Sequence, residues 1–146
     1  MFYEDIEVGA TVRVGSYRMD ADEMMNYARK WDPLPVHTDD ATARKTIFGG
    51  LTASGSHTLA VRVLLMHRVP LQEGLIGAAG WDDIRFHQPV RPGDELSLEV
   101  TWVAKRQSQS KPDRGIITAF MKLVNQKDEV VLSHKGTIFM RLRQPQ

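Results

Sequence analysis

The stretch SGSHTLAVRVLLMHR, residues 54–68, decides how this chain folds. Apolar residues occupy nearly every side of the helix that it would form, which is typical of a helix surrounded by other elements. Pro70 follows soon afterwards and prevents the helix from continuing. We therefore expect one central helix with the remainder of the chain wrapped around it. The apolar residues of this helix are Leu59, Ala60, Val61, Val63, Leu64, Leu65 and Met66.

After Leu75 the apolar residues recur at every second position, which predicts strands with one buried face. Turn-rich connectors at residues 89–95, 108–115 and 125–129 divide this part of the chain into four strands. One more strand is expected upstream, at residues 11–19. Short connectors of this kind favour antiparallel pairing between consecutive strands.

A short helix is expected between Asp20, a typical N-cap residue, and Asp32, because Pro33 prevents its continuation. Residues 32–58 are predicted to form an ordered loop with one short helical turn at residues 39–44. Loops of this length inside compact domains are usually functional. The order of elements predicts an α+β fold in which an antiparallel sheet wraps around one central helix.

Composition and charge exclude several classes of protein. The chain has 146 residues, a length that suits one domain covering residues 1–146. It contains no cysteine, which excludes thiol nucleophiles, thiolate zinc sites and iron–sulfur clusters. The formal net charge is +1, and basic residues are dispersed among acidic ones, so we expect no nucleic-acid partner.

We expect neither an export signal nor a membrane span in this sequence. The first ten residues carry two acids and lack the basic and apolar regions of an export signal. The most apolar stretch, residues 59–69, contains charged residues and is shorter than the roughly 20 residues that a membrane span needs. We expect a soluble, cytoplasmic protein without membrane contact.

Residues 32–39, 48–58 and 81–96 each resemble a segment of one family, the MaoC-like dehydratases or R-specific enoyl-CoA hydratases. The stretch DPLPVHTD at residues 32–39 resembles the hydratase motif of that family, D-x-N-P-L-H-x-D. FGGLTASGSHT at residues 48–58 is similar to the glycine-bearing loop that opens the family's central helix. WDDIRFHQPVRPGDEL at residues 81–96 resembles its F-x-x-P-V-x-x-G-D segment. The three occur in the family's order and at its spacing, which makes the resemblance more specific than any one motif.

This resemblance implies a hot-dog fold and a lyase active in fatty acid metabolism. The implied reaction is the reversible hydration of trans-2-enoyl-CoA, which in reverse is the dehydration of 3-hydroxyacyl-CoA. The implied partner is an acyl-CoA thioester as substrate, and coenzyme A enters only as part of it, so no metal or other cofactor is expected. The family also implies a homodimer or a dimer of dimers, with active sites at the subunit interface.

Site residues follow from the resemblance position by position. Asp32 and His37 would be the catalytic pair, and Gly55 would donate its backbone N–H to the thioester carbonyl as a substrate-binding residue. Ser54 occupies the position of a loop histidine found in some members and is expected at the substrate. In two further departures, Leu34 replaces the usual Asn and Trp31 replaces a frequent Gly.

Physical chemistry supports this choice of residue types. Water is a weak nucleophile and needs a base, and the enolate that forms at the thioester oxygen needs hydrogen-bond donors. Pro33 and Pro35 restrict the backbone between Asp32 and His37, which helps hold both side chains at one water. Gly55 stands where the central helix begins, with free N–H groups and the positive end of the helix dipole.

Other polar residues have simpler interpretations. Asp39 and Asp40 are expected to cap a helical turn, and Gly49 and Gly50 to occupy tight turns. A metal site built from His37, Asp39 and His57 is disfavoured, because the spacing matches no recognised set of ligands.

The histidines, tryptophans and basic residues outside the proposed site also have expected roles. Histidines 57, 67 and 87 are expected to be structural or solvated, and tryptophans 31, 81 and 102 to be core residues. Arg85, Arg91, Lys105 and Arg106 are treated as surface charges that could also meet the phosphates of coenzyme A.

Two alternative functions remain at this point. The first is a thioesterase of the same fold; such enzymes commonly place a carboxylate on the central helix, yet residues 54–68 contain neither Asp nor Glu. The second is a non-catalytic acyl-CoA binding module, which the replacement of the usual Asn by Leu34 makes credible.

Overall fold

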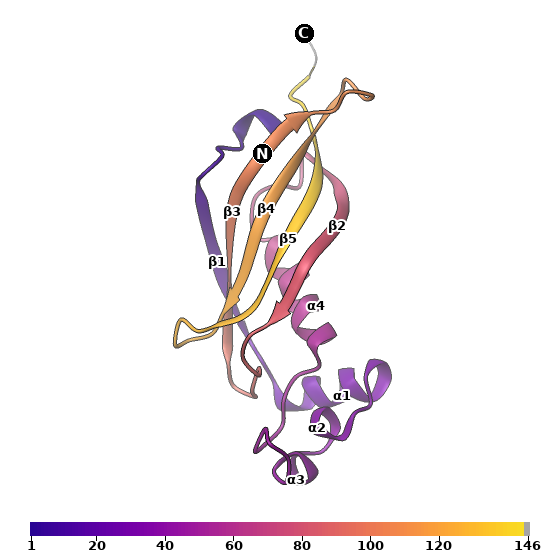
Figure 1. Cartoon of the computed structure of the whole chain (residues 1–146), viewed down its shortest axis with the longest axis vertical. Coiled ribbons are helices and arrows are strands. Elements are labelled where there is room, and N and C mark those ends of the chain that lie inside the picture. Colours follow the sequence, from indigo (N-terminus) through magenta and orange to yellow (C-terminus); the bar gives the residue numbers. More distant parts are fainter. Residues whose placement is uncertain (145–146) are drawn as a thin grey trace.

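The described part of the chain, residues 1–144 of a computed structural model, is built on one five-stranded antiparallel sheet. The strand order is β1-β3-β4-β5-β2, so β1 and β2 form the two edges (Figure 1). The four C-terminal strands and the upstream strand are all confirmed. Their bounds are β1 Thr11–Arg18, β2 Leu75–Phe86, β3 Glu95–Gln107, β4 Arg114–Val124 and β5 Val130–Arg141.

The central helix, α4, spans Gly55–Met66 and lies against one face of the sheet (Figure 1). Its residues Val61 and Leu65 are buried in the same core cluster as the alternating apolar residues of the central strands. The period-two pattern is confirmed most clearly in β3, where Leu96, Leu98, Val100 and Trp102 are all buried. The fold class predicted from the sequence, an α+β hot-dog fold, is therefore confirmed.

One side of α4 is left uncovered by this chain. Val63 is 37% exposed and Leu64 is 46% exposed, and Ala60 is exposed beside them. The expectation that the chain itself surrounds this helix is thus wrong on that side. The sheet covers only the face of the helix that carries Val61 and Leu65, because a single curved sheet contacts a helix from one direction.

Three short helices lie beyond the end of the sheet, next to the N-terminal end of α4 (Figure 1). The helix α1, Ala21–Trp31, has the predicted N-cap: Asp20 accepts a 2.9 Å hydrogen bond from the backbone N–H of Glu23. The following segment is more helical than predicted, with α2 at Pro35–Thr38 and α3 at Asp40–Ala43. Proline suits the first position of a helix, since it has no N–H to leave unpaired there. A 3-10 helix, η1, covers Tyr3–Asp5.

Only one of the three tryptophans is a core residue. Trp102 is 1% exposed, as predicted, whereas Trp31 is 65% exposed and Trp81 is 42% exposed. Trp31 is the last residue of α1, with the Lys30 ammonium 5.0 Å from its ring centre. Trp81 lies on the edge strand β2, where no neighbouring strand covers its outer side. No helix within residues 1–144 has the length and apolarity that crossing a membrane requires.

Candidate active site

Asp32 and His37 lie side by side. Asp32 is the C-cap residue of α1 and His37 belongs to α2, and the turn between them brings Oδ2 of the carboxylate to 3.6 Å from Nε2 of the imidazole. This separation is longer than a direct hydrogen bond. The Asp32 side chain is 42% exposed and the His37 side chain 13% exposed, so solvent reaches the carboxylate more readily than the ring. The two predicted catalytic residues are thus brought together.

The other ring nitrogen of His37 determines which tautomer the imidazole adopts. Nδ1 lies 2.8 Å from the backbone oxygen of Thr52 and 3.2 Å from its hydroxyl oxygen. A carbonyl oxygen can only accept, so Nδ1 carries the hydrogen. In the neutral ring the lone pair is then on Nε2, the nitrogen that faces Asp32. His37 is therefore oriented as a base toward the space beside the carboxylate.

Asp32 also contacts a row of hydroxyl groups. The Ser54 hydroxyl donates a 2.7 Å hydrogen bond to Oδ2 of Asp32 and lies 2.9 Å from the hydroxyl of Ser56. Tyr27 in turn donates a 3.0 Å hydrogen bond to Ser56. Ser54 is fully buried, so its hydroxyl orients the carboxylate. The predicted contact between Ser54 and a substrate stays a prediction.

Gly55 is the first residue of α4, directly after the N-cap Ser54. Its φ angle is not in the left-handed region, so the backbone does not require glycine there. A Cβ on Gly55 would come within 2.8 Å of Cζ of Phe86, so the ring, which packs over this position and is largely exposed, would have to move aside.

A cleft of about 410 Å³ lies between His37 and Gly55. His37 and Thr52 line it from the segment before α4, Gly55 and Thr58 line it from α4, and Phe86 lines it from the end of β2. Asp32 is not among its lining residues and meets it through His37. The cleft thus has a base on one side and a helix N-terminus on another, with apolar walls supplied by Phe48, Ala53, Pro89, Val90 and Val131.

Several polar residues have structural roles, as predicted. Asp39 is the N-cap of α3 and accepts hydrogen bonds from the backbone and hydroxyl of Thr42. Asp40 does not cap the turn, although a capping role was predicted for it: as the first residue of α3 it pairs with Arg44 at 2.6 Å and accepts a hydrogen bond from the backbone N–H of Leu51. Gly49 has a φ of +66°, as expected for a turn glycine.

His57 is buried and structural. Its ring stacks on Tyr27 with centroids 4.4 Å apart, and its Nε2 lies 3.4 Å from Oε1 of Glu23. Burial lowers the pKa of His57 below its usual value, because the charged ring would lose solvation. Within residues 1–144, no three side chains of His, Cys, Asp or Glu come close enough to hold a metal ion.

Two of the basic residues considered for coenzyme A are engaged within the chain. Arg91 donates to the backbone oxygens of Gly50 and Phe48, and Lys105 donates to the backbone oxygen of Ile6 at 2.8 Å. These contacts tie loops and the N-terminal segment to the sheet. Arg85 and Arg106 remain exposed.

Sequence reasoning missed Thr52, Ser56, Tyr27 and Phe86. The alternation of hydroxyl residues at positions 52, 54 and 56, just before and at the start of a helix, was a usable signal for a hydrogen-bonded row. No local pattern marks Phe86, which reaches Gly55 only through the packing of β2 beside α4.

Comparisons with known proteins agree with this architecture. The family model described as "MaoC like domain" matches residues 5–131. The crystal structure of a MaoC-like dehydratase from Rhodospirillum rubrum superposes with a TM-score of 0.92 at 37% sequence identity, covering 99% of each chain. An (R)-hydratase from A. caviae involved in PHA biosynthesis superposes with a TM-score of 0.74 at 26% identity, covering 92% of this chain and 97% of that one.

A match to one curated relative is partial. Mesaconyl-CoA hydratase from Haloarcula marismortui is 36% identical over 67 residues, which is 45% of this chain and 19% of that enzyme. The match therefore concerns a small part of the larger hydratase.

Proposed function

The chain belongs to the MaoC-like domain family, and on that basis we propose that it catalyses the reversible hydration of trans-2-enoyl-CoA. The dehydratase and the two hydratases among its relatives support a hydratase or dehydratase reaction in general. The observation that carries the specific proposal is the Asp32–His37 pair, with Nε2 of the imidazole free beside the cleft that Gly55 lines.

In the proposed reaction, one water molecule binds between the Asp32 carboxylate and Nε2 of His37. Both groups accept hydrogen bonds, so together they orient the two O–H bonds of the water and leave an oxygen lone pair directed at Cβ of the enoyl group. As the C–O bond forms, the pair takes one proton from the water. The same pair then returns a proton to Cα, so that H and OH have been added across the double bond. General acid–base catalysis of this kind contributes about a hundredfold or more.

The thioester oxygen gains negative charge while the C–O bond forms. Gly55 is the first residue of α4, so its N–H has no partner inside the helix. In the proposed reaction this N–H donates a hydrogen bond to the thioester oxygen, and the helix dipole adds to the stabilisation. Addition of water transfers no electrons to an acceptor. We therefore propose that the reaction uses no redox cofactor or metal and that coenzyme A takes part only as the substrate's carrier.

We also propose that the protein works as a homodimer or a dimer of dimers. The uncovered side of α4 presents Val63 and Leu64, and the neighbouring edge strand β2 presents Ile76 and Trp81, each more than a third exposed. Edge strands with exposed apolar residues are usually covered by pairing. A second copy placed there would cover both the helix and the sheet edge and would border the cleft near Phe86, which is 55% exposed.

Incubation with crotonyl-CoA tests the proposed activity against both alternatives. Loss of the enoyl absorbance without release of free thiol is expected, because water adds to the double bond and the thioester stays intact. Release of free thiol would identify a thioesterase instead. Binding without turnover would identify a non-catalytic acyl-CoA module. The Asp32→Asn variant is the control for contaminating hydratase and should be nearly inactive.

A further inference from the structure

Arg62 is a buried cation that forms no ion pair with any of residues 1–144. Its residue exposure is 5%, and its Nε has no hydrogen-bond partner within residues 1–144. Burial lowers the pKa of Arg62 to about 10, which still leaves the guanidinium charged at neutral pH. Its close neighbour is the Trp81 ring, with the guanidinium carbon 4.9 Å from the ring centre.

An unpaired buried charge is unfavourable for folding, because the lost solvation is not replaced by a carboxylate or by hydrogen bonds. A cation–π contact of this kind offsets only part of that cost. Arg62 thus has unused hydrogen-bonding capacity for an anion, since its guanidinium can bind a carboxylate through two parallel N–H donors.

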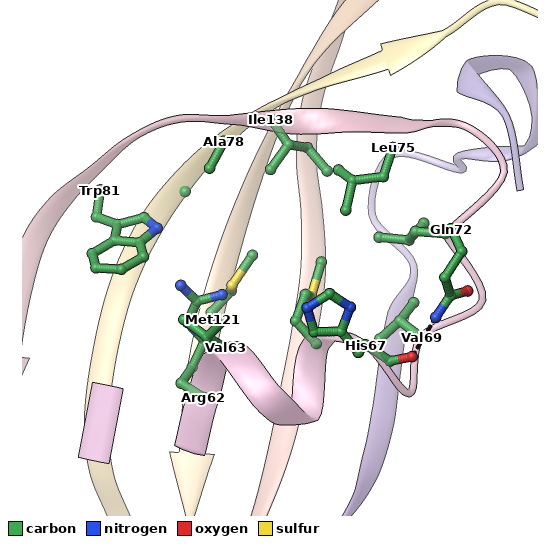
Figure 2. Close-up of a pocket in the computed structure, with 13 residues that line it drawn as sticks. Arg62, Val63, His67, Val69, Gln72, Leu75, Ala78, Trp81, Met121 and Ile138 are labelled. Carbon is green, nitrogen blue, oxygen red and sulfur yellow. Dashed lines mark hydrogen bonds between the residues drawn. The ribbon is translucent and has the colours of Figure 1, made fainter. Parts of the chain in front are cut away.

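The guanidinium lies at a cavity of about 130 Å³ between α4 and the strands β2 and β5. Figure 2 shows Arg62 pointing from the helix toward the sheet, with Trp81 beside its guanidinium. The walls are mostly apolar and include Val63, Met121 and Ile138. A cavity of about 150 Å³ in another protein accommodates benzene, so this one has room for roughly six non-hydrogen atoms.

This cavity and the cleft of the candidate active site have no lining residue in common, but they follow one another along the same three elements. The cleft at the active site is lined by Gly55 and Thr58 of α4, Phe86 of β2 and Val131 of β5. The cavity at Arg62 is lined by later residues of α4 and β5 and by earlier residues of β2, as expected for successive positions along one groove.

Helix geometry places Gly55 and Arg62 on one line. Seven residues make nearly two turns, so the two residues lie on the same side of α4 about 10.5 Å apart along its axis. Side chains on a helix point toward its N-terminus, which brings the guanidinium nearer to Gly55. A six-carbon acyl chain whose thioester oxygen is bound at Gly55 covers most of the remaining distance.

We propose that Arg62 binds a carboxylate at the far end of the acyl chain, so that the preferred substrates are CoA esters of dicarboxylic 2-enoic acids. This inference rests on the proposed hydratase function for the placement of the thioester. Apolar side chains contact the methylene groups, and Arg62, the first α4 residue that lines the cavity and so the one nearest to the cleft, supplies a cationic group for the terminal carboxylate.

Steady-state hydration of trans-2-hexenedioyl-CoA and trans-2-hexenoyl-CoA tests the proposal, since the two chains differ in the terminal carboxylate. The wild-type kcat/KM should favour the dicarboxylic substrate by at least about tenfold, the lower end for a hydrogen bond between charged groups. In Arg62→Met this ratio should fall to about one or below, and Arg62→Lys should retain part of it. Arg68→Met, which removes an exposed arginine just after the same helix, should keep the wild-type ratio.

Two outcomes would overturn the proposal: a wild-type ratio near one, or an unchanged ratio in Arg62→Met. If a ratio near one is accompanied by dissociation of Arg62→Met in sedimentation velocity, the anion that meets Arg62 belongs to a second copy of the chain. If Arg62→Met does not fold, the wild-type and Arg62→Lys ratios decide the question.

Binding of unreactive esters separates this inference from the proposed function. Adipyl-CoA should bind the wild-type protein at least about tenfold more tightly than hexanoyl-CoA in calorimetric titration, and Arg62→Met should lose the difference. Carboxylate-dependent binding without hydration of either enoyl ester would overturn the hydratase function and support the Arg62 site. Hydration with equal binding of the two saturated esters would overturn the Arg62 site alone.

Discussion

The hydroxyl of Ser54 donates a 2.7 Å hydrogen bond to Oδ2 of Asp32, a residue 22 positions earlier in the chain. The same oxygen lies 3.6 Å from Nε2 of His37. The contact therefore sets which carboxylate oxygen faces the imidazole. Because Ser54 is also the N-cap residue of α4, the orientation of the carboxylate is tied to the start of the helix that carries Gly55.

Asp32→Asn and His37→Ala should each lower kcat for crotonyl-CoA hydration by at least about a hundredfold, because each removes one of the groups that activate water. Neither side chain belongs to the apolar core, so circular dichroism should show folded proteins. Asp22→Asn, an exposed carboxylate in the first turn of α1, is the matched control. Near-normal turnover in either folded catalytic variant would contradict the assignment.

Ser54→Ala should lower kcat by about tenfold or more while leaving the binding of substrate largely intact. The lost bond is charge-assisted, and such bonds contribute about 1.5–3 kcal/mol. Ser56→Ala provides the comparison, since its hydroxyl contacts Ser54 and Tyr27 but not Asp32. Equal kcat values for the two variants would show that the bond to Asp32 does not orient the carboxylate for catalysis.

Gly55→Pro and Gly55→Ala together test the backbone donor. Both add a Cβ that meets the Phe86 ring, but only proline removes the N–H, and proline is tolerated at the first helical position. The proline variant should have a kcat lower than that of the alanine variant by a factor equivalent to about 2.7–4 kcal/mol, the usual cost of losing one oxyanion donor. Similar kcat values in two stable proteins would mean that the thioester oxygen is bound elsewhere.

Stability should fall as the pH is lowered below about 6.5, the usual pKa of histidine. Burial lowers the pKa values of His57 and His134 in the folded protein, so between those values and 6.5 the unfolded chain binds more protons. The contribution of each histidine is at most about 1.4 kcal/mol per pH unit. Urea unfolding between about pH 7.5 and 5 measures the slope.

Substitution of either buried histidine checks the origin of this slope. His57→Gln and His134→Gln should each make the free energy of unfolding less dependent on pH, whatever they do to its absolute value. A slope that persists in the double variant His57→Gln/His134→Gln would assign the pH dependence to other groups.

Leu64→Asp should convert the protein to monomers in sedimentation velocity at micromolar concentration, because it places a charge on the uncovered side of α4. Val103→Asp is a closely matched control, since the two side chains have nearly equal exposure, 46% and 47%, but Val103 lies on β3. The control should sediment like the wild type. A monomeric wild-type protein would contradict the proposed dimer.

The positions of helices and strands could be predicted because they depend on local patterns. Each of these patterns depends on residues close together in the chain: the capping residue Asp20, the prolines Pro33 and Pro70 that end helices, and the alternation after residue 75. The proximity of Asp32 and His37 was predictable for the same reason, since only four residues separate them. The helix at Pro35–Thr38 was not predicted, because a single turn has too few residues to show a period.

The sequence alone therefore determined the α+β fold, its central helix and a close Asp32–His37 pair, all of which follow from interactions within a few residues. Only the tertiary structure decided which groups orient that pair, since Thr52 contacts His37 across 15 residues and Ser54 contacts Asp32 across 22. It also decided that Phe86 covers Gly55 and that Arg62 faces a cavity without an ion-pair partner among residues 1–144. Thr52 and Ser54 join the segment before α4 to α2 and α1, whereas Phe86 and Trp81 bring β2 to α4. Tertiary packing of this kind joins residues that no local pattern relates.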